Sequence, residues 1–423
     1  MERPELPLTD ESRHVVFRLE ALPPLPELER EWRSLEAAGN PSFFTSWHWS
    51  GTLLTAVPPA SRPKLLRGRA NGATVALALL GANETRRRRG WVRSRGLYLN
   101  ETGDPRFDTL TIEHNDILVA TQWEPVIWHE LIAWFAGLYD QADELHLGGS
   151  LRRLPQPALG RCRAGYSETS FPSYSVDLCR LAASDGKLYP VLSANARQQL
   201  RRAVRYFERF GALRLAEAES ASEALTFFDS MKALHCASWE RRGKPHSFTG
   251  EFFEPFHRLL IERSFAEGGT QLLKVYAGDR VIGYLYNFRL GNRIYAYQSG
   301  FDDADRHERP GIVTHFLAIR NAFRSGARVY DFMAGRNRLK ESFATRCEPM
   351  LWHVVQQPRL TFRLEHFARR LKHALVPSCG GDPSYPASAL NDGEGHDSAT
   401  ARKSACRTSN ETVPQPPSLP SPP

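Results

Sequence analysis

A basic loop ahead of a helix is the sequence feature most suited to chemistry. Arg306 and Arg309 precede Pro310 and Gly311, and apolar residues at helical spacing follow directly. Proline suits the first turn of a helix, where free N–H groups and the positive end of the helix dipole attract phosphate groups. Glycine would let a phosphate approach the backbone closely. The pattern predicts a pyrophosphate site; the alternative is a solvated basic loop that caps an ordinary helix.

The strand expected at residues 293–301, RIYAYQSGF, leads into this loop. Its main-chain groups could hold an extended ligand and polarise a carbonyl group of that ligand. We therefore expect the phosphate-bearing ligand to contact residues from both the strand and the helix start, namely Gln298, Ser299, Arg306, Arg309, Gly311, Ile312 and Val313.

Two residues on neighbouring strands are the candidates for catalysis. Tyr297 lies on the strand 293–301, and Asp331 lies near the end of the strand expected at 327–333. Asp331 would be a general base if burial raised its pKa. An aspartate at the end of a strand also suits capping of the following turn, and capping is the favoured interpretation.

Two further residues are candidates for contact with substrate. His315 falls one turn into the helix after the basic loop, and Lys340 could neutralise a phosphate or a carboxylate. A lone histidine in a helix is more commonly a packing residue, however, and most lysines are ordinary surface residues.

The elements that must position these residues follow one order between residues 212 and 357. The pattern predicts a strand, two helices, three strands at hairpin spacing, a helix, a strand, a short helix around 336–345 and a last strand. An antiparallel meander that leads through a helix into a parallel strand opens a crevice where the strands separate. Ligands favour such a crevice beside the carboxyl ends of strands.

The first half repeats this order more weakly, which indicates an internal duplication. The expected strands are 14–20, 64–69, 74–80, 115–120 and 142–149, and the expected helices are 25–39, 46–57 and 123–139. The joint equivalent to the basic loop, ATQWEP at 120–125, has neither a glycine nor a basic residue. We therefore expect only the second copy to bind a nucleotide. The first copy would have a structural role or would form one side of the acceptor site.

Composition excludes several classes of protein. The chain has 423 residues, 41% of them hydrophobic, and a formal net charge of +8, which favours anionic partners but is mild for a nucleic-acid binder. Its six cysteines form no C-x-x-C pair, so we expect no metal site. No signal peptide precedes the first unit, and no apolar run approaches the ~20 residues of a membrane span, so we expect a cytoplasmic protein.

Several stretches resemble the CelD/BcsL-type acetyltransferases of the GNAT superfamily, which are similar to FemAB-type aminoacyl transferases with two GNAT-like units. Together the stretches span most of residues 95–357, in family order. They read TIEHNDIL, LSANARQQLRRAVRYFERFG, LHCASWERRG, GYLYNF, YQSGF, RPGIVTHFLAI and YDFMAGRNRLKESFA.

The resemblance implies an α/β (α+β) fold of two tandem GNAT-like units, each a mixed twisted sheet flanked by helices. It implies acyl-CoA, in the first place acetyl-CoA, as the donor and a small-molecule or glycan-like amine as the acceptor, with exopolysaccharide or cell-envelope synthesis as the setting. In GNAT folds the loop between the first two helices shapes the acceptor pocket. Trp239, Arg241 and Arg242 are therefore acceptor candidates, with a mobile charged loop as the alternative.

One departure from the family leaves the general acid unassigned. Family members tend to have Tyr-Lys where this chain has Leu339 followed by Lys340, and GNAT enzymes often protonate the leaving thiolate with a tyrosine on that helix. A catalytically inactive GNAT-like binding module is therefore one alternative. A FemAB-like transferase that uses aminoacyl-tRNA is another, although the long helical hairpin insertion of many such proteins is not recognisable here. Nucleic acid is expected only in that case.

The expected organisation has four parts. Residues 1–11 form a disordered N-terminus, 12–175 a GNAT-like unit without cofactor, 176–375 the acyltransferase unit, and 376–423 a disordered tail rich in Ser and Pro. The basic amphipathic helix expected at 359–375 could lie on a membrane surface, but packing of its apolar side onto the protein is the simpler interpretation.

Overall fold

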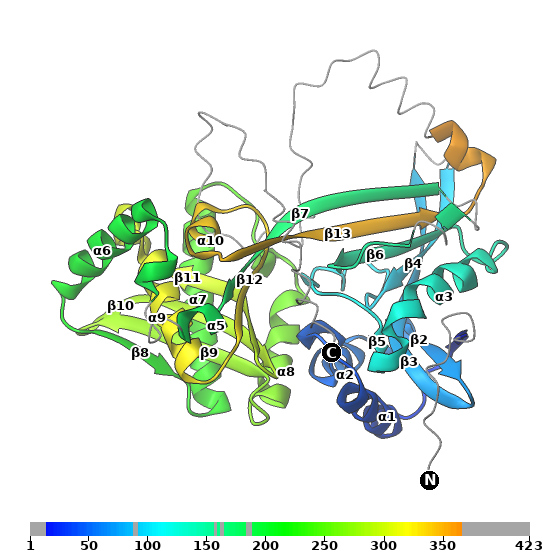
Figure 1. Ribbon diagram of the computed structural model, residues 1–423, viewed down its shortest axis with the longest axis horizontal. Helices are drawn as coiled ribbons and strands as arrows, with labels where there is room; N and C mark the ends of the chain where they lie inside the picture. Colours follow the sequence, from blue (N-terminus) through cyan, green and yellow to red (C-terminus); the bar gives the residue numbers. More distant parts are fainter. Residues whose placement is uncertain (1–13, 88–91, 156–158, 161–164, 183–187, 366–423) are drawn as a thin grey trace, which may run out of the picture.

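The computed structural model describes residues 14–87, 92–155, 159–160, 165–182 and 188–365. The N-terminus 1–11, the tail 376–423 and most of the helix expected at 359–375 lie outside these residues. Figure 1 shows the first half of the chain, in blue and cyan, on one side of the molecule and the second half, in green and yellow, on the other.

The first half begins with a strand and two helices and continues into an antiparallel meander. Its elements are β1 (Val16–Glu20), α1 (Leu25–Ala38), η2 (Phe43–Thr45), α2 (Trp47–Ala56), η3 (Pro59–Ser61), β2 (Lys64–Ala70), β3 (Ala73–Arg87), β4 (Val92–Leu99), β5 (Leu118–Val119), η5 (Thr121–Trp123), α3 (Glu124–Ala136) and β6 (Glu144–Ser150).

A long strand and two helices connect the halves, and the second half then repeats the order of the first. The connecting elements are β7 (Gly165–Asp177), α5 (Cys179–Ala182), η6 (Tyr189–Val191) and α6 (Ala194–Glu208). The second half contains β8 (Leu213–Glu217), α7 (Ala221–Arg241), η7 (Ser247–Thr249), α8 (Phe253–Ser264), β9 (Thr270–Ala277), β10 (Arg280–Leu290), β11 (Arg293–Phe301), η8 (Asp303–Glu308), α9 (Pro310–Arg324), β12 (Val329–Ala334), α10 (Arg338–Phe343) and β13 (Arg346–Gln356).

The strands form one continuous sheet rather than two. Within the described residues its order is β1-β2-β3-β4-β6-β13-β7-β12-β11-β10-β9-β8, and β5 adds to β3. The mixed α/β fold of two similar units is confirmed. The unexpected part is the junction: β13 leaves the second half and pairs with β6 of the first, from Leu351 opposite Ser150 to Gln356 opposite Glu144.

The strand β7, which makes this junction, was not expected from the sequence. It pairs with β13 from Gly165 to Ser175, and Figure 1 shows the two strands running side by side between the halves. Pro172 lies opposite Pro349 in this ladder. Proline cannot donate to a ladder and lowers strand propensity, and several residues in the middle of β7 are exposed, so its sequence lacks an apolar alternation.

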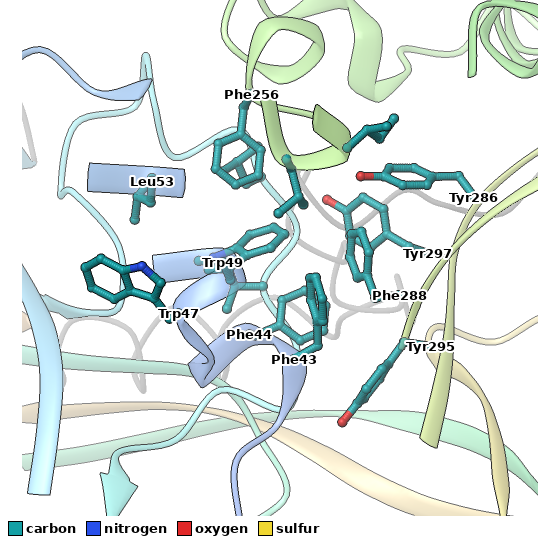
Figure 2. Packing of buried hydrophobic residues seen from close by; sticks show 14 of the residues in the cluster. Phe43, Phe44, Trp47, Trp49, Leu53, Phe256, Tyr286, Phe288, Tyr295 and Tyr297 are labelled. Atoms are coloured by element: carbon teal, nitrogen blue, oxygen red, sulfur yellow. The ribbon is translucent and has the colours of Figure 1, made fainter. Parts of the chain in front are cut away.

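An aromatic core also joins the halves. Phe43 from η2 stacks on Phe288 of β10 with 4.3 Å between ring centroids, and Trp49 from α2 meets Phe256 of α8 at 4.9 Å. Figure 2 shows these rings facing Tyr297 and its neighbours on β11. Because aromatic rings contribute the largest buried areas of any side chain, this cluster ties α2 to the second half.

Candidate functional site

The parallel strands β11 and β12 separate soon after they begin. They pair at only three positions, from Arg293 opposite Val329 to Tyr295 opposite Asp331. Beyond Tyr295, β11 keeps β10 as its hydrogen-bonded partner, whereas β12 continues along β7. The sheet therefore opens towards the carboxyl end of β11, where an extended ligand can bind to main-chain groups.

A bulge lies at the opening. Tyr286 pairs with Gln298 and Asn287 pairs with Ala296, which leaves Tyr297 as an extra residue in β11. A bulge redirects side chains and leaves main-chain groups outside the ladder. The bulged residue, Tyr297, directly precedes Gln298 and Ser299, which are two of the residues expected to contact the ligand.

The basic loop leads from β11 into α9 as the sequence predicts. Arg306 and Arg309 are exposed, and Arg309 adopts a left-handed conformation with φ 59° directly before Pro310. Pro310 is the first residue of α9, where the first N–H groups lack a partner one turn earlier in the helix, although Ile312 N–H donates to the carbonyl of Arg309 at 3.1 Å. Arg309 donates to the side chain of Gln199 on α6, which fixes the guanidinium beside the helix start.

Gly311 lies in a closely packed position at the start of α9. A Cβ at this position would lie 3.0 Å from Leu339 Cδ1 and 3.1 Å from the ring of Phe301. The glycine therefore permits close packing of α9 against α10 and β11, in addition to any approach of a phosphate. Ile312 and Val313 are buried beneath it in the first turn.

The end of α7 covers the outer part of β11. His235 donates from Nδ1 to the carbonyl of Ser299 (2.9 Å), and burial lowers the pKa of His235 to about 4. Gln298 donates weakly to Ser247 Oγ at 3.4 Å. Trp239 is 3% exposed, and its Nε1 has no hydrogen-bond partner among the described residues.

Arg241 connects this helix end to the basic loop. Its guanidinium lies 2.8 Å from Asp303 in η8, while Arg242 is half-buried beside it. The structure therefore brings the predicted acceptor residues Trp239, Arg241 and Arg242 to the same end of β11 as the predicted phosphate-binding residues.

The two catalytic candidates have surroundings that argue against simple acid–base roles. Tyr297 is fully buried in the aromatic core, and burial holds the pKa of its hydroxyl well above the ordinary value. Burial would also raise the pKa of Asp331, but His114, Arg293 and the Met333 N–H together lower it to about 2. The condition set for Asp331 as a general base, a raised pKa, is not met. Its bond to Met333 N–H (2.7 Å) agrees with the capping interpretation.

His315 and Lys340 lie on the opposite face of the sheet from α7. His315 is 6% exposed and bonds Tyr330 through Nδ1 at 2.9 Å, and burial lowers its pKa to about 3. Lys340 is 4% exposed and donates to the carbonyl of Ala334 at 2.7 Å. Both side chains are part of the packing between α9, α10 and β12.

A residue that the sequence did not single out lies at the base of the opening. His114 comes from the first half, and its Nε2 lies 3.1 Å from Asp331 Oδ2. It borders a polar cavity of about 250 Å³ between the halves, which Arg293 and Tyr295 of β11 also line. The only signal in the sequence was the stretch TIEHNDIL, which resembles a family segment without indicating which residue matters.

Comparison with a protein-family model decides the nature of the second half. Residues 194–341, from the start of α6 through most of α10, match the model "Acetyltransferase (GNAT) domain". Residues 194–341 form a GNAT-type acetyltransferase domain. The basic loop, the bulged strand and the opening between β11 and β12 all lie within it. No curated protein sequence matches the chain.

Three solved structures resemble most of this chain. FemX superposes with a TM-score of 0.52 at 10% identity, over 79% of this chain and 96% of FemX. L-PGS from Bacillus licheniformis gives 0.49 at 13% identity, over 83% and 98% of the two chains. A tandem GNAT protein from the clavulanic acid biosynthesis pathway gives 0.43 at 12% identity, over 82% and 100%. At 10% identity the likeness to FemX extends to the fold alone.

The part of the chain that the structure describes contains neither a candidate metal site nor a candidate membrane span. No group of three or more His, Cys, Asp and Glu side chains there is arranged to hold a metal ion. No helix in that part of the chain is both long and apolar enough to cross a membrane.

The first half has its own opening opposite that of the GNAT domain. Strands β4 and β6 pair in parallel at three positions, from Gly96 opposite Glu144 to Tyr98 opposite His146. A cavity of about 170 Å³ lies beyond them, and Glu101 lines it. Helix α3 begins at Glu124, within the stretch ATQWEP, and has no basic residue in its first turn, unlike the loop before α9.

Glu101 should make stability fall as pH rises. Burial, and then the charge of Asp108, raise the pKa of Glu101 to about 8, above the ordinary 4.5. The folded protein therefore keeps a proton that the unfolded chain releases between these values, so stability is lost as pH rises through this window. We expect Glu101→Gln to be more stable than the wild type at about pH 8, by on the order of 2 kcal/mol, and similar at about pH 5.

Chemical denaturation at both pH values measures the effect. Glu262→Gln, on the exposed face of α8, is the matched control and should show no such dependence. An equal effect of Glu101→Gln at both pH values would contradict the raised pKa.

Proposed function

We propose that the protein is an N-acyltransferase that moves an acyl group, in the first place acetyl, from acyl-CoA to an amine. The observation that carries the proposal is the joint between β11 and α9. The GNAT domain opens between β11 and β12 and places a helix start with exposed arginines at the end of the open strand. Main-chain groups along β11 suit a pantetheine arm, and the helix start suits a pyrophosphate.

The donor site would draw on residues from three elements. Arg306 and Arg309 would pair with phosphate oxygens, and Gly311 and Val313 in the first turn of α9 would supply N–H groups, while Ile312 N–H bonds the carbonyl of Arg309. Gln298 and Ser299 would lie along the arm. Acyl-CoA brings the activated thioester carbonyl, and the main chain beside the bulge at Tyr297 would hold that carbonyl for attack.

The two halves would bind different substrates. Residues 176–375 would hold the donor, and residues 12–175, without cofactor, would wall the acceptor site. The polar cavity between the halves fits a small-molecule or glycan-like amine because carboxylates, amides and the ring of Tyr295 line it. Trp239, Arg241 and Arg242 lie at the other end of β11, near Asp303, and are a second set of acceptor candidates. Synthesis of exopolysaccharide or of the cell envelope remains our proposal for the setting, and the cytoplasm for the location.

Calorimetric titration with acetyl-CoA tests the donor site. We expect the wild type to bind and the double variant Arg306→Glu, Arg309→Glu to lose affinity about 100-fold, since each charge-assisted bond contributes roughly 1.5–3 kcal/mol. Gly311 should not be substituted, because its packing makes misfolding a confounding outcome. Arg324→Glu, exposed at the far end of the same helix, is the matched control and should bind like the wild type.

Two outcomes would overturn the proposal. Folded wild-type protein that does not bind acetyl-CoA would favour an aminoacyl-tRNA donor or an inactive binding module. Unchanged binding by the double variant would place the donor elsewhere in the chain.

A further inference from the structure

The cavity between the halves is built for a polar ligand. Its lining contributes the amides of Asn40 and Asn115, the carboxylates of Asp116 and Glu124 and the guanidinium of Arg152. Arg152 pairs with Asp116 and, at 3.1 Å, with Glu124. Arg152 therefore offsets part of the negative charge of the two carboxylates. The polar lining suits a small amine with several hydrogen-bonding groups rather than an apolar ligand.

One wall of this cavity carries a histidine paired with a buried carboxylate. His114 Nε2 lies 3.1 Å from Asp331 Oδ2, and Arg293 Nη1 lies 2.6 Å from the same oxygen. Asp331 is 2% exposed, and its other oxygen accepts from Met333 N–H. Among the described residues no hydrogen bond engages His114 Nδ1, so this nitrogen is available to a ligand in the cavity.

The backbone holds His114 in an uncommon conformation. Its φ is 49°, in the left-handed region, which costs energy for a residue other than glycine. Ser42 Oγ donates to its carbonyl at 2.8 Å, and Asn115 N–H donates to the carbonyl of Gly149 at 2.9 Å. Bonds on both sides therefore fix the backbone at His114 between a segment before α2 and the end of β6.

The position of this pair matches the place where acyl transfer would occur. Asp331 and Tyr295 form the last pair before β11 and β12 separate, and the ring of His114 lies 5.2 Å from the ring of Tyr295. The donor would enter along β11 from the opposite end, where α9 begins. An amine in the cavity would thus reach the base of the opening from the side of the first half.

We propose that His114 is the general base of the acyl transfer, accepting a proton at Nδ1 from an amine held in this cavity, with Asp331 and Arg293 as positioning residues. The proposal rests on the function proposed above. The amine nitrogen forms its bond to the thioester carbon, the carbon–sulfur bond breaks, and the CoA thiolate leaves and takes a proton from solvent. His114 takes the proton lost by nitrogen and returns it to solvent.

Asp331 contributes by fixing the tautomer. A carboxylate that lies 3.1 Å from Nε2 favours the tautomer with its proton on Nε2, which leaves the lone pair on Nδ1, and it stabilises the imidazolium that forms. The low pKa of Asp331, about 2, keeps this carboxylate ionised at neutral pH.

Kinetics with two amines of different basicity test the proposal. The probes are glucosamine and the more basic ethanolamine, each with acetyl-CoA. We expect His114→Gly, which suits the left-handed backbone, to lower kcat about 100-fold with unchanged affinity for acetyl-CoA. The loss should be larger for ethanolamine, because a more basic amine needs more help to lose its proton. Added imidazole should restore part of the rate in His114→Gly and none in His114→Asn, where the space is filled.

A role of His114 in structure alone would lower the rate equally for both amines, without rescue by imidazole, and would overturn the proposal.

If the wild type acetylates neither amine, ¹⁵N spectra of the histidine rings test the tautomer of His114 in the absence of any acceptor. They should show His114 protonated at Nε2, and Asp331→Asn, whose amide can donate, should reverse this. A wild type protonated at Nδ1 would overturn the proposal. Failure of the wild type to bind acetyl-CoA would instead overturn the proposed function.

Discussion

Trp49→Ala is expected to lower the free energy of unfolding by about 4 kcal/mol, because truncation of a buried tryptophan loses its transfer free energy and leaves a cavity. Trp49 is fully buried on α2. Its ring lies 4.9 Å from Phe256 of α8 and 5.9 Å from Phe288 of β10, so the cavity would open between the halves, as Figure 2 makes clear. Denaturation followed by fluorescence and circular dichroism measures the change, and both signals should report a single shifted transition.

Trp49→Phe is the matched control for this experiment. It keeps a ring in the cluster, and Trp49 Nε1 has no hydrogen-bond partner among the described residues, so the substitution loses no bond. We expect a cost of about 1 kcal/mol. Two separate transitions in Trp49→Ala, with only the first half destabilised, would contradict a core shared by the halves.

Gly300→Ala is expected to destabilise the protein by about 3 kcal/mol and to weaken binding of acetyl-CoA, because added atoms in a packed site force the backbone apart. A Cβ at Gly300 would lie 2.2 Å from the carbonyl oxygen of Met231 and 3.1 Å from Leu234 Cβ, both on α7. Either α7 or β11 must shift, and Ser299, which accepts from His235 of α7, would shift with them.

Thermal unfolding and calorimetric titration measure both effects. Gly160→Ala is the control, because a Cβ there would meet no atom within 4 Å. We expect that variant to match the wild type in both measurements. If Gly300→Ala is as stable as the wild type, α7 does not pack closely against β11 at this point, and the prediction is wrong.

Much of the second half was predictable because each element has a strong local signal. The strands β9 to β11 alternate between tight turns at Gly278 and Gly291, and the helix α9 begins at Pro310 as the proline indicates. Helix α6 begins after Ser193, whose side chain accepts from Ala196 N–H, so a local N-cap marks its start. These features depend on a few neighbouring residues, so they can be recognised without knowledge of the fold.

The strands that join the halves were not predictable in the same way. β4 and β7 were missed because arginines, glycine and a central proline obscure their alternation. The sequence correctly indicated that β13 is a strand, but its partner β6 lies some 200 residues earlier in the chain. Register between such distant strands is set by the whole sheet rather than by local propensity.

The sequence by itself determined the order of elements, the GNAT character of residues 194–341 and the basic loop at the start of α9, because spacing and residue type carry that information. Only the tertiary structure decided which side chains meet. It buried Tyr297 among rings from the first half, placed His315 and Lys340 in packing, and set His114 against Asp331. Burial and the pairing of charges arise from contacts between distant segments, and these control the pKa values on which acid–base chemistry depends.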